Sequence, residues 1–423
     1  MAIKICVIAI LELSLQSKTT TIMIAEFSIK NFKSIRAEQR LSFEATLDTY
    51  LSEESSVEVK DGVRLLKLGI IYGANASGKS NVLHALDYFR TLVCFQPSDR
   101  NDELGVVPFM LDDTSADEKT EMSMTFYLDK EKYVLSIEFD NTRIYKETLS
   151  VYLTTRPTEL YTRKYNQDTD SSEISFSVKL GLLKKSQRLI EGNTINNRTV
   201  LAAFSVSNVE SSRLNKVYDF FNKTLEPIIE PNLILSPFIH KTLEEDRDGS
   251  VKEFILKFLK ASDFNISGIE WNRGLPVRFQ HKTNGGVHTL SEDMESSGTM
   301  RFMGMTIILQ HLLGNNHFVI MDEVESSIHY ELLSYFLKVF LINSERESQL
   351  LVTTHDINLL NEDFIRRDEI WFTDKNEDGE TELKRLTNLR LSKRLSPYNA
   401  YKQGKLVDLP FVGSAYLNLN DVD

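Results

Sequence analysis

The feature that most constrains the fold is an apolar run that ends in a glycine-rich turn. Leu65–Tyr72 is almost continuously apolar and is followed directly by Gly73-Ala-Asn-Ala-Ser-Gly78-Lys79-Ser80. After this turn, apolar residues recur at helical spacing from Asn81 to Phe95. The first pattern predicts a buried strand and the second an amphipathic helix. We therefore expect a parallel α/β unit in which a strand, a tight loop and a helix follow one another.

The loop carries the residue types that a phosphate group requires. Gly73 and Gly78 permit backbone conformations that aim successive N–H groups at an anion, and a helix starting near Lys79 adds its positive end. Lys79 supplies a charge for the β- and γ-phosphates, and the Ser80 hydroxyl is placed to bind Mg²⁺. A plain glycine-rich start of a helix would not explain the lysine and the serine together. The residues expected to bind ATP here are Gly73, Asn75, Ala76, Ser77, Gly78, Lys79, Ser80 and Asn81.

A second strand–helix–strand pattern lies nearer the C-terminus. Phe318–Met321 is apolar and ends in Asp322-Glu323, Tyr330–Ile342 has a helical period, and Gln349–Thr353 is again apolar. A carboxylate at the end of a strand can hold Mg²⁺ through water, and its neighbour can polarise an attacking water. We therefore expect Asp322 to bind the metal and Glu323 to act as the general base.

A short Ser-Gly segment precedes another predicted helix. Glu295-Ser296-Ser297-Gly298-Thr299 stands before a helix that is expected to begin near Met300. Such a segment can be an ordinary helix N-cap, and taken alone that is the better interpretation. A serine and a glycine at a helix N-terminus can also bind an anion. Both interpretations remain open at this point.

Taken together, these segments resemble the ABC-type ATPases. More closely, the chain resembles the bacterial AAA-fifteen/AAA-twenty-one group, relatives of the overcoming-lysogenisation-defect, SMC and RecF ATPases. This resemblance implies an ABC-type P-loop nucleotide-binding domain of the α/β class, a mixed sheet with helices that uses ATP and Mg²⁺. The segments that carry the resemblance are Ile29–Ile35, Gly73–Ser80, Glu295–Thr299, Ile320–Glu323 with Ile328-His329, Thr353–Asp356, and Tyr401–Gly404 with Pro410.

The resemblance also implies roles for single positions. Ser296 and Gly298 would reach the γ-phosphate bound by a second subunit, and His355 would sense the γ-phosphate as a catalytic residue. Glu325–His329 would cross the dimer interface, and Asn31–Ser34 would approach the nucleotide. The signature departs from the usual Leu-Ser-Gly-Gly-Gln, because it is Glu295-Ser-Ser-Gly-Thr299 here. Gln96 is the candidate for the usual lid-loop glutamine.

The pattern along the chain suggests where the fold is interrupted. The apolar period becomes helical from about residue 196, and the polar stretch Asn166–Ser177 is expected to be a loop. Met23 opens a regular alternating segment, so the fold is expected to start there. The expected divisions are a non-native or flexible N-terminal extension over 1–22, the first part of the ATPase domain over 23–155, a mainly helical insertion over 156–262, and the second part of the ATPase domain over 263–423.

Composition limits the surroundings in which the chain acts. Its 61 acidic and 49 basic residues give a net charge of −12, which argues against a general nucleic-acid-coating surface but not against a local basic groove. Cys6 and Cys94 cannot build a disulfide framework, so a reducing cytoplasm is expected. No apolar run reaches the roughly 18–20 residues that span a bilayer, so no membrane partner is expected.

The resemblance suggests a role in pairs of proteins. Members of the group often accompany a separate effector in bacterial anti-phage or abortive-infection systems. The chain is therefore expected to dimerise, or form a higher homo-oligomer, around nucleotide and to regulate a nuclease or toxin partner. Two alternatives stay open: a DNA-repair-type, DNA-binding ATPase related to RecF and SMC, and a nucleotide-sensing scaffold with little turnover.

Overall fold

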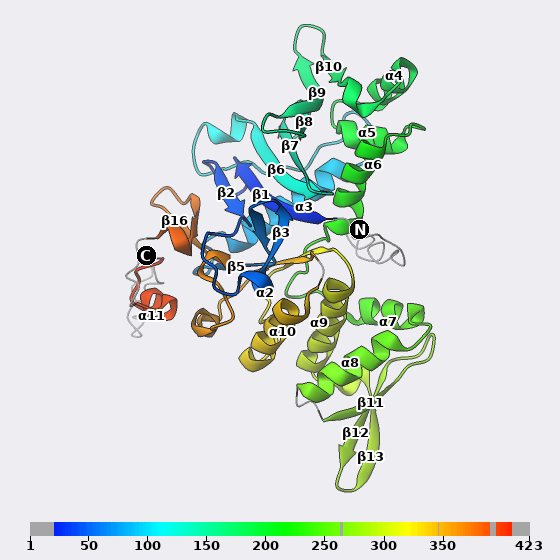
Figure 1. Ribbon diagram of the computed structural model, residues 1–423, viewed down its shortest axis with the longest axis vertical. Helices are drawn as coiled ribbons and strands as arrows, with labels where there is room; N and C mark the ends of the chain where they lie inside the picture. Colours follow the sequence, from blue (N-terminus) through cyan, green and yellow to red (C-terminus); the bar gives the residue numbers. More distant parts are fainter. Residues whose placement is uncertain (1–20, 263–264, 346, 390–394, 408–423) are drawn as a thin grey trace, which may run out of the picture.

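The computed structural model describes residues 21–262, 265–345, 347–389 and 395–407. Its centre is a five-stranded sheet in which four neighbouring strands run parallel and the last strand runs antiparallel (Figure 1). The first three strands are buried along their whole length, which is why they appear in the sequence as continuous apolar runs. The strands, in spatial order, are β14 (Phe318–Met321), β15 (Gln349–Thr353), β5 (Leu68–Tyr72), β16 (Ile370–Lys375) and β17 (Thr381–Arg385).

A seven-stranded antiparallel sheet lies beside this parallel sheet. Its order is β10-β9-β8-β7-β6-β1-β2. Alternating burial along β1 and β7 shows one face packed in the core and the other facing solvent, as the alternating sequence predicts. The strands are β1 (Ile22–Lys30), β2 (Gln39–Ser42), β6 (Thr120–Leu128), β7 (Glu131–Phe139), β8 (Ile144–Tyr152), β9 (Thr158–Asn166) and β10 (Ser171–Phe176).

The parallel sheet separates two apolar cores. Ile71, Leu351 and Trp371 point to one face, where they join the core with α3 (Lys79–Cys94) and the antiparallel sheet. Their neighbours Ile70 and Val352 point to the other face and pack on helices. Figure 1 shows α9 and α10 together on this second side of β5. The helices of the second side are α7 (Ser236–Glu245), α8 (Ser250–Ala261), α9 (Ser297–Gly314), α10 (Tyr330–Asn343) and α11 (Pro397–Lys402).

The middle of the chain differs from the expected helical insertion over 156–262. β9 and β10 occupy its first part and extend the antiparallel sheet, so Asn166–Ser177 is not the loop that its polarity predicts. β10 is an edge strand whose exposed polar positions alternate with half-buried ones, and two of the latter, Ile174 and Phe176, pack against the core. Helices begin only afterwards. They are α4 (Lys184–Asn193), α5 (Val200–Val206), α6 (Ser212–Asp219) with a π-turn over Phe220–Thr224, and then α7 and α8.

The apolar run before the phosphate loop forms two strands, β4 (Val63–Leu66) and β5, which belong to different sheets. β4 pairs with β3 (Ser56–Lys60), which follows the short helix α2 (Ser52–Ser55), and only β5 enters the parallel sheet. The change occurs at Lys67, whose side chain is buried and donates from Nζ to Ser344 O at 2.7 Å. An apolar run does not reveal such a change, because strands of both sheets are buried here.

A three-stranded sheet near α8 was not predicted. Its strands are β11 (Ile266–Glu270), β12 (Arg278–Thr283) and β13 (Gly286–Ser291), paired in sequence order. The sheet extends away from the core at the lower end of Figure 1, beyond α8. Among the described residues, no helix has both the length and the apolar character needed to cross a membrane.

Candidate nucleotide-binding site

The phosphate loop follows β5 and ends where α3 begins at Lys79. Ala76 has φ +61° and Gly78 has φ +103°, so the loop passes twice through the left-handed region. Turns of this kind point successive N–H groups to one side and form an anion-binding concavity. Gly73 has no room for a side chain, because an added Cβ would lie 2.4 Å from both Ser77 Oγ and Thr373 Oγ1. The loop is therefore shaped by close contacts as well as by its own flexibility.

Lys79 is buried without an acidic partner. The side chain is 5% exposed, and Nζ donates to Gly73 O at 3.0 Å and Ala74 O at 3.1 Å. No carboxylate of the described residues forms an ion pair with Nζ, and burial lowers the Lys79 pKa although Asp322 and Glu323 oppose the shift. A cation held by carbonyl groups alone is stabilised by an anion that enters the loop. This is the structural observation that fits the loop to a phosphate chain.

A pair of threonines from the C-terminal hairpin holds the loop in place. Ser77 Oγ shares a hydrogen bond of 2.6 Å with Thr373 Oγ1, and Thr381 Oγ1 donates to Ser77 O at 3.0 Å. Thr381 Oγ1 also lies 2.7 Å from Ser34 Oγ, which accepts from Asn81 Nδ2 at 2.6 Å. Sequence reasoning missed both threonines, since single hydroxyl residues some 300 positions away carry no motif. The turn after β1 is thus fixed to the loop and to the first turn of α3.

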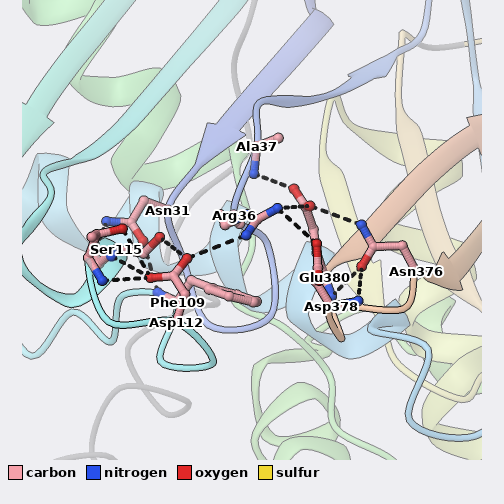
Figure 2. A network of polar contacts seen from close by, with 10 residues as sticks. Asn31, Arg36, Ala37, Phe109, Asp112, Ser115, Asn376, Asp378 and Glu380 are labelled. Carbon is pink, nitrogen blue, oxygen red and sulfur yellow. Dashed lines mark hydrogen bonds and ion pairs between the residues drawn. The ribbon is translucent and has the colours of Figure 1, made fainter.

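The turn after β1 is also tied to two other loops, as Figure 2 shows. The Arg36 guanidinium lies 3.5 Å from Asp112 and 3.3 Å from both Asp378 and Glu380. Glu380 also accepts from Ala37 N at 2.5 Å. Arg36 therefore joins the turn after β1, the loop before β6 and the turn between β16 and β17, and this junction supports the segment that covers the phosphate loop.

Asp322 and Glu323 follow β14, and Thr353 at the end of β15 binds both. Thr353 Oγ1 donates to Asp322 Oδ1 and accepts from Glu323 N at 2.8 Å. Asp322 is 4% exposed, whereas Glu323 has φ +43°, a conformation that is rare for a residue with a side chain. Such strain is tolerated only where the surroundings enforce it, and it is frequent at functional sites.

His355 lies beside this pair. Its Nε2 atom is 3.8 Å from Glu323 Oε1, and its main-chain N donates to Glu325 Oε1 at 2.6 Å. Burial lowers the His355 pKa, and the charge of Lys79 lowers it further against the opposing carboxylates. The imidazole is therefore neutral at neutral pH. The structure brings Lys79, Asp322, Glu323 and His355 to one edge of the parallel sheet.

The signature residues occupy the start of α9. Ser296 Oγ accepts from Thr299 N at 3.0 Å, so the helix-cap interpretation is confirmed. An added Cβ at Gly298 would lie 2.8 Å from Ser327 O, in the loop after Glu323. Helix α9 packs on the face of the parallel sheet opposite α3. The signature is therefore built on the other side of the sheet from the helix of its own phosphate loop.

One extended segment connects the two sides. Residues 225–229 pair with the edge of β14, and Ile229 O accepts from Asp322 N at 3.0 Å. The next residue, Glu230, lies 3.0 Å from His84 Nε2 on α3 through its carboxylate. Its carbonyl oxygen accepts from Arg301 Nη1 on α9 at 3.3 Å. Glu230 thus contacts the helix of the phosphate loop and the helix of the signature.

Comparison with known proteins assigns the family. A family model described as "AAA domain, putative AbiEii toxin, Type IV TA system" matches residues 69–361, which is more than half of the chain. The chain belongs to this AAA-domain family. The match begins in β5 and ends shortly after His355, so it contains the phosphate loop, the signature and the Asp-Glu pair.

Solved structures similar to this AAA domain include two SMC heads. The SMC head domain from Thermotoga maritima has 15% identity and a TM-score of 0.41, and the match covers 86% of this chain and 98% of that one. An SMC head bound to the C-terminal winged-helix domain of ScpA has 14% identity and a TM-score of 0.45, with 90% and 99% covered. No curated protein matches the chain.

The remaining predicted residues of this AAA domain are placed as follows. Ser80 lies in the first turn of α3, and Asn75 is exposed at the tip of the loop. Gln96 is not near this loop: it lies beyond the far end of α3 and donates to Ala202 O at 2.8 Å on α5, so it is wrong as the lid-loop glutamine. The family resemblance alone suggested it, and in the structure it anchors α5.

The metal expected in this AAA domain would be held by few protein atoms. No group of three or more His, Cys, Asp or Glu side chains suited to a metal ion occurs among the described residues. Mg²⁺ is typically bound by one or two side chains together with water and substrate phosphates, so Ser80 and the buried Asp322 are a sufficient set. When bound, Mg²⁺ neutralises charge on the phosphates.

Proposed function

We propose that the chain hydrolyses ATP to ADP and phosphate at the edge of the parallel sheet. The observation that supports this most strongly is the buried Lys79, whose charge lies near Asp322, Glu323 and His355 and whose hydrogen-bond acceptors among the described residues are loop carbonyls. A cation for the phosphates, a metal-binding carboxylate and a base in one place form the set that phosphoryl transfer to water requires. Backbone N–H groups of residues 73–80 and the start of α3 would bind the β- and γ-phosphates.

Glu323 would take the proton of the attacking water. Its carboxylate is partly exposed and is not locked in a short ion pair among the described residues, since the neighbouring His355 Nε2 atom is 3.8 Å away. The neutral imidazole of His355, which lies beside Glu323, would use its single N–H to donate to a γ-phosphate oxygen. A base of this kind contributes about 10²–10⁴-fold to the rate.

The complete site would contain two copies of the chain. The signature residues Ser296 and Gly298 lie at the start of α9, on the sheet face opposite α3. Their free N-terminal amides can bind an anion. We infer that they meet the γ-phosphate held by a second copy, so that ATP joins two chains face to face.

The ATP cycle would control a separate effector protein, in bacterial anti-phage defence. The family description supports this proposal by naming a toxin–antitoxin system. Such control requires that the effector binds the ATP-joined dimer and the nucleotide-free chain with different affinity. α4–α6 and the β11–β13 sheet are additions outside the parallel sheet that could carry this contact.

The test compares wild-type protein with Lys79→Ala and Glu323→Gln. Steady-state ATP turnover and molecular mass by light scattering are measured with and without ATP and Mg²⁺. We expect both variants to lose hydrolysis by at least about 100-fold, and only Glu323→Gln to remain a dimer with ATP. A Glu323→Gln protein that binds ATP and stays monomeric would overturn the shared site. Unchanged turnover in Lys79→Ala would overturn the hydrolytic role of the loop.

A further inference from the structure

A pocket of about 490 Å³ lies beside the first turn of α9. Residues 231–236 form one wall, and Ser297, Met300 and Arg301 of α9 form another. Ser327, from the loop after Glu323, closes the pocket. The pocket therefore lies between the signature, the loop after the general base and the segment that follows Glu230. None of the roles proposed above uses it.

Arg301 brings an unsatisfied cation to this pocket. The residue is 6% exposed, yet within the described part of the chain its Nε and Nη2 atoms have no hydrogen-bond partner, and only Nη1 donates, to Glu230 O at 3.3 Å. The buried Arg163 makes a useful comparison, because all three of its nitrogens donate, to Ser172 Oγ and to three carbonyl oxygens. Burying guanidinium N–H groups without acceptors is unfavourable, so Arg301 is suited to an acceptor that the described residues do not supply.

The start of α9 adds donors to the same pocket. Ser296 accepts from Thr299 N and Met300 N, which leaves the amides of Ser297 and Gly298 without an acceptor inside the helix. Ser297 lines the pocket together with Arg301. The helix is 18 residues long, so its N-terminus carries a partial positive charge. Two independent groups of donors therefore face one space.

We propose that Arg301 binds a phosphate oxygen of ATP held by the phosphate loop of a second copy of the chain. The proposal rests on the shared site proposed above and adds a catalytic residue to it. The planar guanidinium fork suits phosphate oxygens, since Nε–H and Nη2–H can donate in parallel. Arg301 lies on α9, one turn after Gly298. Because α9 packs on the sheet face opposite the chain's own α3, Arg301 would face the nucleotide of the second copy, as the signature residues would.

The acidic residues that line the pocket favour the phosphate of a nucleotide bound by the second copy over free phosphate from solution. Asp293 and Glu292 line the pocket, and Glu292 accepts from His240 Nε2 at 2.9 Å. The Asp293 carboxylate repels small anions from solution. A nucleotide already bound to Lys79 of the second copy is held in place by that loop and can approach Arg301 despite this repulsion. Inorganic phosphate alone should therefore bind weakly.

An arginine supplied by one subunit to the nucleotide of another acts mainly in the transition state, where charge on the phosphoryl oxygens changes. Groups of this kind raise kcat by about 10³–10⁵-fold in other nucleotide hydrolases. We expect Arg301→Ala to lower kcat by at least about 100-fold, while ATP binding to the chain's own loop changes less than about threefold. Arg301→Lys keeps the charge but loses the paired guanidinium donors, so its kcat should lie between those of wild type and Arg301→Ala.

The deciding experiment mixes two inactive proteins. Lys79→Ala cannot bind ATP but carries Arg301, and Arg301→Ala binds ATP but lacks the arginine. In a mixed dimer, one site combines the intact loop of the second protein with Arg301 of the first. Random pairing then restores up to about a quarter of wild-type ATP turnover. If Arg301 acts within its own chain, no mixed dimer contains an intact site and the mixture stays inactive, which would overturn the proposal.

Controls separate this proposal from folding and from the shared site itself. Arg278→Ala on β12 removes an exposed arginine and should leave turnover unchanged. If Arg301→Ala unfolds, Arg301→Lys replaces it in the mixture. Turnover by Arg301→Ala equal to that of wild type would overturn only this inference, whereas a monomeric Glu323→Gln protein would overturn the shared site. Arg301-dependent binding of inorganic phosphate by Lys79→Ala, with no rescue in the mixture, would overturn the second copy as the source.

Discussion

Thr381 Oγ1 lies directly over Gly78, so that a Cβ added to the glycine would come within 2.1 Å of it. The same hydroxyl donates to Ser77 O at 3.0 Å. The phosphate loop is therefore enclosed by the start of β17, more than 300 residues later in the chain. Its shape depends on the C-terminal hairpin as much as on its own glycines.

We expect Gly78→Ala to abolish ATP binding by two effects. A side chain at φ +103° is strained by about 1–2 kcal/mol, and the contact with Thr381 would push β17 off the loop. Gly62→Ala is the matched control, because Gly62 has φ +75° but no atom within 4 Å. Calorimetric titration with ATP should show normal affinity for the control and none for Gly78→Ala. Equal affinity in both would show that the contact with Thr381 is harmless.

Thr353→Val should slow hydrolysis more than it weakens ATP binding. Valine has the same shape but can neither donate to Asp322 nor accept from Glu323 N. Loss of such a buried partner costs about 1–3 kcal/mol, which corresponds to roughly 5–150-fold in kcat if the strained Glu323 relaxes. Thr353→Ser retains the hydroxyl and should remain close to wild type. The comparison requires kcat and KM for both variants, and a loss confined to KM would contradict the expectation.

Arg163→Met should destabilise the part of the chain that carries α5. Arg163 is fully buried in β9, donates to the carbonyls of Ile195, Asn196 and Arg198, and lies beside Glu147, whose carboxylate binds Val200 N at 2.9 Å. Burial raises the pKa of Glu147 and the Arg163 charge opposes that shift. Methionine would leave these buried carbonyl groups without their donor and Glu147 without a nearby positive charge, a loss of about 1–3 kcal/mol.

Urea unfolding followed by circular dichroism checks this prediction, with the exposed Arg156→Met as the matched substitution. Only the Arg163 variant should shift its midpoint. A similar midpoint for both proteins would mean that the buried pair is not needed to hold α5 on β8 and β9.

Acidification should destabilise the protein through His311. Burial lowers the pKa of His311 to about 4, and the nearby His317 adds to the effect. In the unfolded chain the pKa is about 6.5, so below that pH the unfolded state binds more protons than the folded state. Stability therefore falls as the pH drops from 6.5 to 4, by about 2 kcal/mol at pH 5.

His311→Phe removes this proton uptake and should flatten the loss between pH 6.5 and 5. The ring would still pack near Phe238. His288→Gln on the exposed β13 serves as the control and should keep the wild-type pH dependence. Thermal midpoints at four pH values are sufficient, and parallel curves for wild type and His311→Phe would contradict the assignment.

The parts of the fold that the sequence predicts are those with a local pattern. The strand before Gly73, the helix after Lys79 and the strands before Asp322 and His355 all appear as expected, because buried parallel strands are apolar throughout and helices repeat locally. The same rule fails for Ser171–Phe176. This edge strand has only two apolar residues among polar ones, so its composition is that of a loop, and its pairing with β9 is visible only in three dimensions.

The residues of the candidate site also differ in whether a local sequence pattern predicts them. Lys79, Ser80, Asp322 and Glu323 belong to short motifs whose spacing reflects one turn or one strand end. Thr373, Thr381, Glu230 and Arg301 act through partners that are distant in the sequence, so no local pattern marks them. Gln96 shows the opposite error, since a residue type typical of lid loops is used here to anchor a helix.

Glu230 links the part of the chain that would bind its own nucleotide to the part that would contact the nucleotide of a second copy. Its carboxylate meets His84 on the helix that follows the phosphate loop, and its carbonyl meets Arg301 on the helix that would serve a neighbour. A shift of either helix would act on the same residue, which directly follows a segment bridged to β14 at Leu225 and Ile229. Filling one nucleotide site should therefore alter the affinity of the other. ATP saturation curves are expected to be sigmoidal, and Glu230→Gln should make them hyperbolic.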